Sequence, residues 1–124
     1  MGKINLFVDM DGTVAKFYYK KNYLEKMYEQ GYFKNLPKYA IAKQIDLLAS
    51  QNNDIEVYIL SACIKSPHCK GEKIAWLQKY MPNIDDNHII LCEVGENKLV
   101  KAKNLLKDNF TNATNILLDD YTQN

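Results

Sequence analysis

The sequence lacks the long apolar segment of a membrane protein, because no stretch approaches the roughly 20 consecutive apolar residues that a membrane-spanning helix needs. Its N-terminus also lacks the charged start and apolar core of a signal peptide, so we expect no export. An excess of charge of one sign is missing too, since 16 basic residues are set against 15 acidic ones. The formal charge of +1 gives no support for binding to nucleic-acid polymers or membrane surfaces.

Cysteine is scarce and odd in number, at Cys63, Cys69 and Cys92. In a chain without an export signal this favours reduced thiols, and we expect a cytoplasmic location. Internal repeats, low-complexity tracts and domain linkers are also missing from the sequence. With 124 residues, 47% of them hydrophobic and 25% charged, we expect one small globular domain over residues 1–124.

The most informative segment is Ile4–Val14, with the sequence INLFVDMDGTV. Its apolar half predicts a strand buried on both faces, which runs directly into Asp9 and Asp11. The two carboxylates point the same way if the chain stays extended, or the chain turns at Gly12. Either arrangement crowds two negative charges, which a hard divalent cation such as Mg²⁺ would relieve. A plain acidic turn is the alternative.

Strand-like and helix-like patterns alternate along the rest of the chain, which predicts an α/β fold with a Rossmann-like, three-layer α/β/α parallel sheet. Further strands are expected over Ile55–Leu60, His88–Cys92 and Asn115–Leu118, and helices over Tyr23–Gln30, Lys38–Gln51, Gly71–Tyr80 and Lys98–Lys107. The first connection is longer than a crossover needs. We therefore expect residues 15–36 to form a small helical cap over the strand ends.

Polar residues that suit phosphoryl transfer follow the later strands. Ser61 comes after the second strand, Lys98 begins the helix after the third, and Asp119 and Asp120 follow the fourth. Because parallel strands end at one edge of the sheet, these groups should meet the carboxylates of the first segment. Such a set can attack phosphorus, bind a metal ion and neutralise phosphate oxygens. Taken singly, each is also an ordinary turn residue or a solvated lysine.

The order DMDGT, Ser61, Lys98 and Asp119-Asp120 resembles the four motifs of the haloacid dehalogenase superfamily of phosphotransferases, across residues 4–120. The resemblance implies that Asp9 is the nucleophile that forms an aspartyl-phosphate. It also implies that Asp11 acts first as general acid and then as general base.

The same resemblance implies a phosphate site and a magnesium site. Ser61 and Ala62 would bind the phosphate together with Lys98. The Mg²⁺ ligands would be Asp9, the backbone carbonyl of Asp11, and the pair Asp119 and Asp120, with the direct ligand of that pair left open.

Within the superfamily, the stretches GYFKNLP, LSACIKSPHCKGEKIAWLQKYMP and LLDDYTQN resemble the 5'(3')-deoxyribonucleotidases of the cytosolic type C family. This implies a nucleoside 5'-monophosphate substrate, a base flanked by Phe17, Tyr32 and Phe33, and Lys65 near the phosphate. Aromatic faces suit base stacking. Alternatively, these rings form the small core of the cap.

Members of this family usually continue beyond the paired aspartates, whereas this sequence ends at Asn124. The C-terminal end of the usual fold is therefore expected to be missing, and a homodimer contact could supply the cover. Three other functions stay open: a phosphatase for another small metabolite, an inactive nucleotide- or phosphate-binding module, and a structural fragment.

Overall fold

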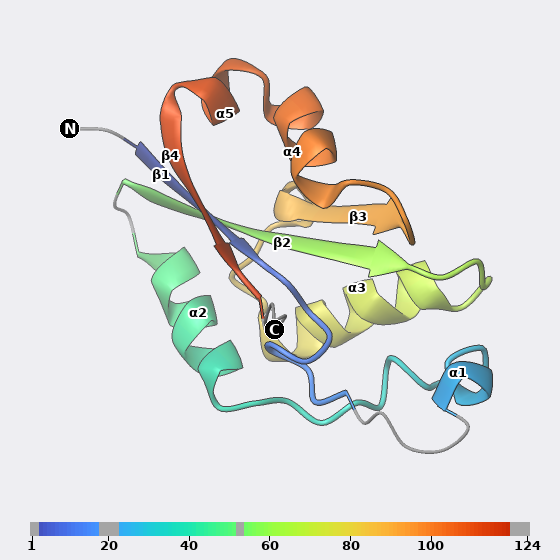
Figure 1. Cartoon of the computed structure of the whole chain (residues 1–124). Coiled ribbons are helices and arrows are strands. Elements are labelled where there is room, and N and C mark those ends of the chain that lie inside the picture. Colours follow the sequence, from blue (N-terminus) through green and yellow to red (C-terminus); the bar gives the residue numbers. More distant parts are fainter. Residues whose placement is uncertain (1–2, 18–22, 52–53, 120–124) are drawn as a thin grey trace, which may run out of the picture.

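A four-stranded parallel sheet forms the centre of the protein (Figure 1). The computed structural model describes residues 3–17, 23–51 and 54–119. The strands lie in the order β3-β2-β1-β4, and their bounds are β1 (Lys3–Val8), β2 (Ile55–Cys63), β3 (Ile89–Glu93) and β4 (Ala113–Leu118). All three pairings are parallel, with β1 between β2 and β4.

Helices cover both faces of this sheet. They are α2 (Ile41–Ser50), α3 (Cys69–Tyr80), α4 (Lys98–Leu106) and α5 (Asp108–Thr111). The short helix α1 (Tyr23–Lys26) lies apart from the sheet, and a 3₁₀ helix η1 (Asp86–His88) precedes β3. Figure 1 shows α2 and α3 on one face and α4 and α5 on the other. The predicted α/β fold with three layers is thus confirmed.

Alternation along the strands divides the core into two parts, because successive side chains point to opposite faces of a sheet. On the α2 and α3 side lie Val8, Val57 and Ile59, and on the α4 side lie Phe7, Tyr58 and Leu60. The largest fully buried side chain is Trp76 of α3, whose indole N–H donates to the Leu36 carbonyl at 2.7 Å. The loop before α2 is thereby fastened to α3.

The helix expected over Tyr23–Gln30 is wrong in length, since only Tyr23–Lys26 is helical. The chain continues in single turns, in which the Tyr28 N–H donates to the Glu25 carbonyl. Tyr28 is 54% exposed, so the later part of the segment buries too little apolar surface to stabilise a longer helix.

Several other boundaries differ by one or two residues, since α3 begins at Cys69, β3 is shifted to Ile89–Glu93 and β4 begins at Ala113.

Two more differences have a clear local cause. The helix expected from Lys38 begins at Ile41, because Lys38 forms an antiparallel bridge with Ala15 and stays extended. The α4 helix ends at Leu106, since Lys107 adopts a positive φ of 52° that breaks helical geometry.

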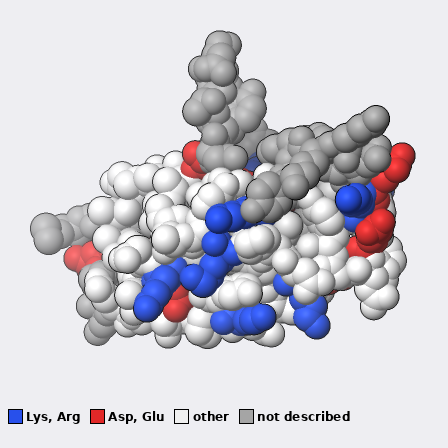
Figure 2. Space-filling view, turned by 90° about the horizontal axis from the view of Figure 1, so that it is seen from below, with Lys and Arg blue, Asp and Glu red and all other residues white. Residues whose placement is uncertain are grey.

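The described part of the predicted cap, residues 15–17 and 23–36, lies on the side of the sheet toward which β1 and β2 run (Figure 1). Figure 2 shows the face of the molecule at the bottom of Figure 1, where basic and acidic side chains are scattered among uncharged ones. Over the described ranges, no helix has the length and apolarity needed to cross a membrane.

We predict that Trp76→Phe lowers the free energy of unfolding by about 2–4 kcal/mol, because it leaves a cavity and removes the donor from the Leu36 carbonyl. Chemical denaturation measures this change. The exposed aromatic variant Tyr28→Phe is the control and should shift stability by less than about 0.5 kcal/mol. Equal stability of the Trp76→Phe and unaltered proteins would contradict the fastening role of Trp76.

Candidate active site

Asp9 and Asp119 occupy equivalent positions at the ends of neighbouring strands. Val8 of β1 pairs with Leu118 of β4, and the backbone N–H of Asp9 donates to the Leu118 carbonyl at 2.9 Å. The Asp119 carboxylate lies close enough to raise the pKa of Asp9. The first and the last predicted motif therefore meet, as the parallel sheet requires.

After Asp9 the chain turns, which decides between the two conformations that the sequence left open. The Met10 carbonyl accepts hydrogen bonds from the backbone N–H groups of residues 13–15. Gly12 has a φ of 85°, a conformation that side chains with a Cβ rarely adopt. The turn keeps Asp11 near Asp9, and the charge of Asp11 also raises the pKa of Asp9.

Lys98, the first residue of α4, forms an ion pair with Asp9, with 3.0 Å between its Nζ and the Asp9 Oδ1. Burial nevertheless raises the pKa of Asp9 to about 6, against the opposing effect of Lys98. Burial by itself would lower the pKa of Lys98, but Asp9 and Asp119 outweigh it and the pKa is raised. The positive charge of Lys98 is thus too weak to offset the effect of burial on the pKa of Asp9.

A second lysine, Lys73 of α3, is fully buried and joins the other predicted groups. Its Nζ donates to Asp11 Oδ2 at 2.9 Å, to Ser61 Oγ at 2.9 Å and to the Ala62 carbonyl at 2.6 Å. All three N–H bonds of the ammonium are therefore used, which is what a buried charge requires. This one side chain connects the turn after β1 with the carboxyl end of β2.

The Lys73 contacts orient the two groups that it holds. An ammonium has no acceptor, so the Ser61 oxygen accepts from Lys73 and its own proton stays available for another acceptor. Asp11 uses Oδ2 for Lys73, while its Oδ1 is buried without a hydrogen-bond partner among the described residues. One ammonium thus holds both the Ser61 hydroxyl and the Asp11 carboxylate.

The second strand is longer than predicted, because β2 continues to Cys63 and Ser61 is still paired with Leu91 of β3. Ser61 therefore lies within the last part of the strand instead of after it. The strand pairing fixes its backbone, and Lys73 fixes its side chain.

Sequence reasoning missed Lys73. The available signal was its place on α3, one helical turn from the buried residues Cys69 and Trp76, so that a lysine stands in an apolar stripe. Lysine side chains are usually exposed, so this signal alone is no reason to expect a buried one. Its burial becomes evident only from the groups that it contacts in the structure.

The predicted base-flanking residues differ in their surroundings. Phe17 and Tyr32 are half-buried and meet edge to face, with 5.9 Å between ring centroids. Phe33 is only 1% exposed and belongs to the main core, with the Lys73 Nζ 5.0 Å from its ring centroid. Its ring therefore has no face open to a base in this conformation. Lys65 is exposed in the loop after β2.

The predicted metal ligands lie only partly within the described structure. Asp120 falls outside it, and within the described ranges no three carboxylate, imidazole or thiol groups are clustered to hold a metal ion. Asp9 and Asp119 nevertheless offer only oxygen atoms, in a place where burial raises the pKa of Asp9 in spite of its ion pair with Lys98. This chemistry fits a hard divalent cation better than a transition metal.

The sequence matches one protein family over most of its length: residues 19–120 match the family described as 5' nucleotidase, deoxy (pyrimidine), cytosolic type C protein. The chain belongs to this family. The matched range of the cytosolic type C family includes Ser61, Lys73, Lys98 and Asp119, whereas the turn that carries Asp9 and its partner carboxylate precedes it.

Two curated relatives are provisionally named 5'(3')-deoxyribonucleotidase. The protein of Staphylococcus aureus (strain MSSA476) is 31% identical over 85 residues, which is 68% of this chain and 45% of the relative. The protein of Staphylococcus epidermidis (strain ATCC 35984) is 30% identical over 81 residues, which is 65% of this chain and 43% of the relative. The chain thus spans less than half the length of either relative.

We predict that Lys73 and Asp11 are energetically coupled. In a double-mutant cycle with Lys73→Met and Asp11→Asn, the coupling free energy should be about 1–3 kcal/mol, because the ammonium is fully buried. The measurement is the free energy of unfolding of the four proteins in the presence of a chelator.

The control cycle uses the exposed pair Lys3 and Glu56, whose charged atoms are 3.3 Å apart. With Lys3→Met and Glu56→Gln its coupling should be below about 0.5 kcal/mol, since water screens exposed ion pairs. Equal coupling in the two cycles would contradict a buried Lys73 ammonium.

Proposed function

We propose that this chain hydrolyses phosphomonoesters through an aspartyl-phosphate intermediate, with nucleoside 5'-monophosphates, including deoxyribonucleotides, as the preferred substrates. The observation that supports this best is the pair of differently held carboxylates, Asp9 against Lys98 and Asp11 against Lys73. One can attack while the other moves a proton. Membership in the cytosolic type C family and the names of the relatives support the nucleotide substrate.

In the first step, Oδ2 of Asp9 attacks phosphorus while Lys98 holds Oδ1. The bond between phosphorus and the ester oxygen breaks, and Asp11 gives its proton to the leaving alkoxide. The products of this step are an alcohol, here a nucleoside, and a phosphoryl group bonded to Asp9.

In the second step, water attacks the phosphorus of the aspartyl-phosphate and Asp11 accepts a proton from that water. The acyl-phosphate bond breaks, so that inorganic phosphate leaves and the Asp9 carboxylate is restored. The Asp11 oxygen that exchanges protons in this scheme is Oδ1, because Oδ2 accepts from Lys73.

The phosphate oxygens would be bound by the Ser61 hydroxyl, the Ala62 backbone and the Lys98 ammonium, with Lys65 contributing from the loop after β2. Each of these groups donates a hydrogen bond or positive charge to an anion. The Ser61 proton is available for this purpose because Lys73 already donates to the Ser61 oxygen.

Magnesium is the proposed cofactor, held by Asp9, the Asp11 backbone carbonyl, Asp119 and Asp120. When bound, Mg²⁺ neutralises negative charge on the phosphoryl oxygens and on the crowded carboxylates. The raised pKa of Asp9 supports the need for a further positive charge at this position.

The base of the substrate would meet the cap, where Tyr32 and Phe17 are the proposed stacking residues. Phe33 is better suited to support Tyr32, since their rings meet edge to face with 5.1 Å between centroids. A smaller phosphoester would not reach these rings.

A cytoplasmic location and a homodimer complete the proposal. The three cysteines are free thiols, as expected in a reducing compartment. The edge strand β4 has the exposed apolar residues Ile116 and Leu117, which a second copy could cover.

We predict that Asp9→Asn reduces phosphate release from nucleoside monophosphates at least about a thousand-fold, because it removes the nucleophile and leaves the size of the side chain unchanged. Phosphate release is measured with and without Mg²⁺ on a panel of monophosphates, and circular dichroism checks the fold.

The matched control is Asp108→Asn, an exposed aspartate on α5 at the other end of the sheet (Figure 1). This variant should keep full activity. Activity retained in Asp9→Asn would exclude the covalent mechanism, and no release by the unaltered protein would favour the inactive binding module.

We also predict that Tyr32→Ala raises the KM for nucleoside monophosphates about tenfold, because stacking on a base contributes about 1–3 kcal/mol. The KM for a small aliphatic phosphoester should change less than about twofold. Steady-state kinetics on both substrates measures the difference. A parallel loss on both would argue against a base contact at Tyr32.

A further inference from the structure

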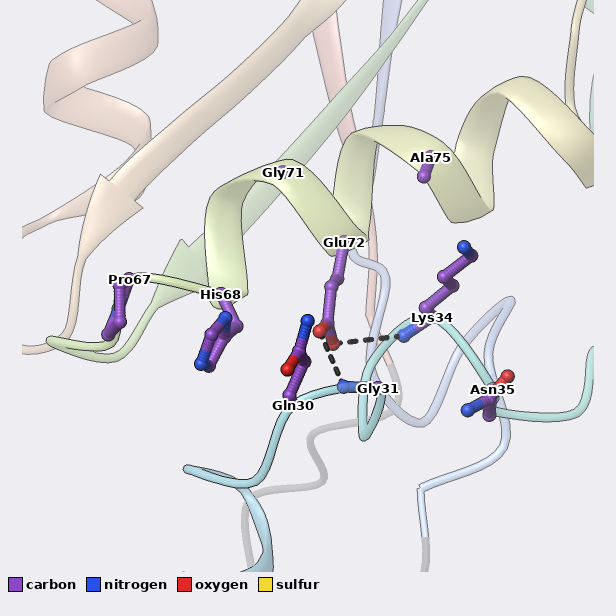
Figure 3. Close-up of a pocket in the computed structure, with 9 residues that line it drawn as sticks. All are labelled: Gln30, Gly31, Lys34, Asn35, Pro67, His68, Gly71, Glu72 and Ala75. Carbon is purple, nitrogen blue, oxygen red and sulfur yellow. Dashed lines mark hydrogen bonds between the residues drawn. The ribbon is translucent and has the colours of Figure 1, made fainter.

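The Glu72 carboxylate attaches the cap to α3, in addition to the hydrogen bond from Trp76 to the Leu36 carbonyl. In the first turn of α3, Glu72 accepts from the backbone N–H of Gly31 at 2.6 Å and of Phe33 at 3.1 Å, with a longer contact of 3.4 Å to that of Lys34. Figure 3 shows its side chain pointing from the helix to this loop. Backbone N–H groups gathered around a charged acceptor form strong hydrogen bonds.

The next residue of the helix, Lys73, points to the proposed catalytic acid Asp11. Phe33 lies between the two: its N–H donates to Glu72, and its ring faces the Lys73 ammonium at 5.0 Å. Successive residues of one helical turn thus hold the backbone of the cap and the proposed proton-transfer group. This short connection links the backbone of residues 31–34 to the position of Asp11.

The surroundings of the contact are open on one side. A cavity of about 510 Å³ lies between the cap and α3, and Gln30, Asn35 and His68 line it together with Glu72 (Figure 3). Apolar packing therefore supports the loop on the Phe33 side, while Glu72 supports it on the cavity side. Gly31, with a φ of 89°, begins the loop in a conformation that a Cβ would strain.

We propose that Glu72 is a positioning residue that determines substrate specificity: by fixing the backbone of residues 31–34, it sets the place of Tyr32 over the strand ends. This inference rests on the proposed function, in which Tyr32 meets the nucleobase. Glu72 acts through the loop and does not contact the phosphate. Its loss should therefore affect substrates that reach the cap and spare those that do not.

The contact itself is tested without any turnover, by amide hydrogen exchange of the full chain. In Glu72→Ala the Gly31 and Phe33 amides should exchange at least about tenfold faster, since they lose a charged acceptor. In Glu72→Gln, which keeps one acceptor oxygen, the increase should be smaller. Unchanged exchange at both amides in both variants would overturn the proposal.

The consequence for specificity is tested by kinetics on a nucleoside 5'-monophosphate and a small aliphatic phosphoester. Glu72→Ala should raise the KM for the nucleotide at least about fivefold, with kcat for the small ester within about twofold of the unaltered value. The control is Glu29→Gln, which removes a charge from an exposed position of the cap. Equal losses on both substrates, or the same effect in Glu29→Gln, would overturn the specificity role.

The two measurements separate this proposal from the proposed function. If the unaltered chain turns over neither substrate, the proposed function fails and the specificity role of Glu72 fails with it. The amide exchange result still decides whether Glu72 holds the loop. If turnover is normal and exchange is unchanged, only the role of Glu72 is wrong.

Discussion

The buried ammonium of Lys73 is the constraint on which the rest of the site depends. A lysine with no exposure must have each N–H bond satisfied, or the cost of burying its charge is not offset. Its partners come from the turn after β1 and from the end of β2, so Lys73 connects α3, the turn and the strand with one another. The same contacts orient Ser61 and Asp11. The need to satisfy a buried ammonium therefore also positions two residues of the proposed site.

Two lysines from opposite layers of the fold each bind one of the two carboxylates that follow β1. Lys98 comes from α4 on one face and binds Asp9, while Lys73 comes from α3 on the other face and binds Asp11. The environments differ, since Lys73 is fully buried and Lys98 is partly exposed. Different environments are what allow neighbouring carboxylates to take different chemical roles. A parallel sheet with helices on both sides provides this arrangement at its carboxyl edge.

The strands, their parallel arrangement and the positions of Asp9 and Lys98 near the strand ends were predictable, because apolar runs and the polar residues that follow them are local features of the sequence. The order of the strands within the sheet was not predicted. The role of Lys73 was not predictable, since its burial arises only when α3 packs on the sheet. Burial of the Phe33 ring likewise depends on tertiary packing and removes one predicted base contact. The shortness of α1 has the same origin, because Tyr28 in its continuation stays exposed and only Met27 packs against the core.

The most direct test of a nucleophilic Asp9 is to stop turnover of a nucleoside monophosphate with acid within milliseconds and to locate the trapped phosphoryl group by peptide mass spectrometry. The proposed mechanism, in which Lys98 holds Asp9 Oδ1 and the other carboxylate oxygen attacks, predicts a phosphoryl group on the peptide that contains Asp9. A phosphoryl group on any other residue, or turnover that leaves none on the protein, would contradict the mechanism.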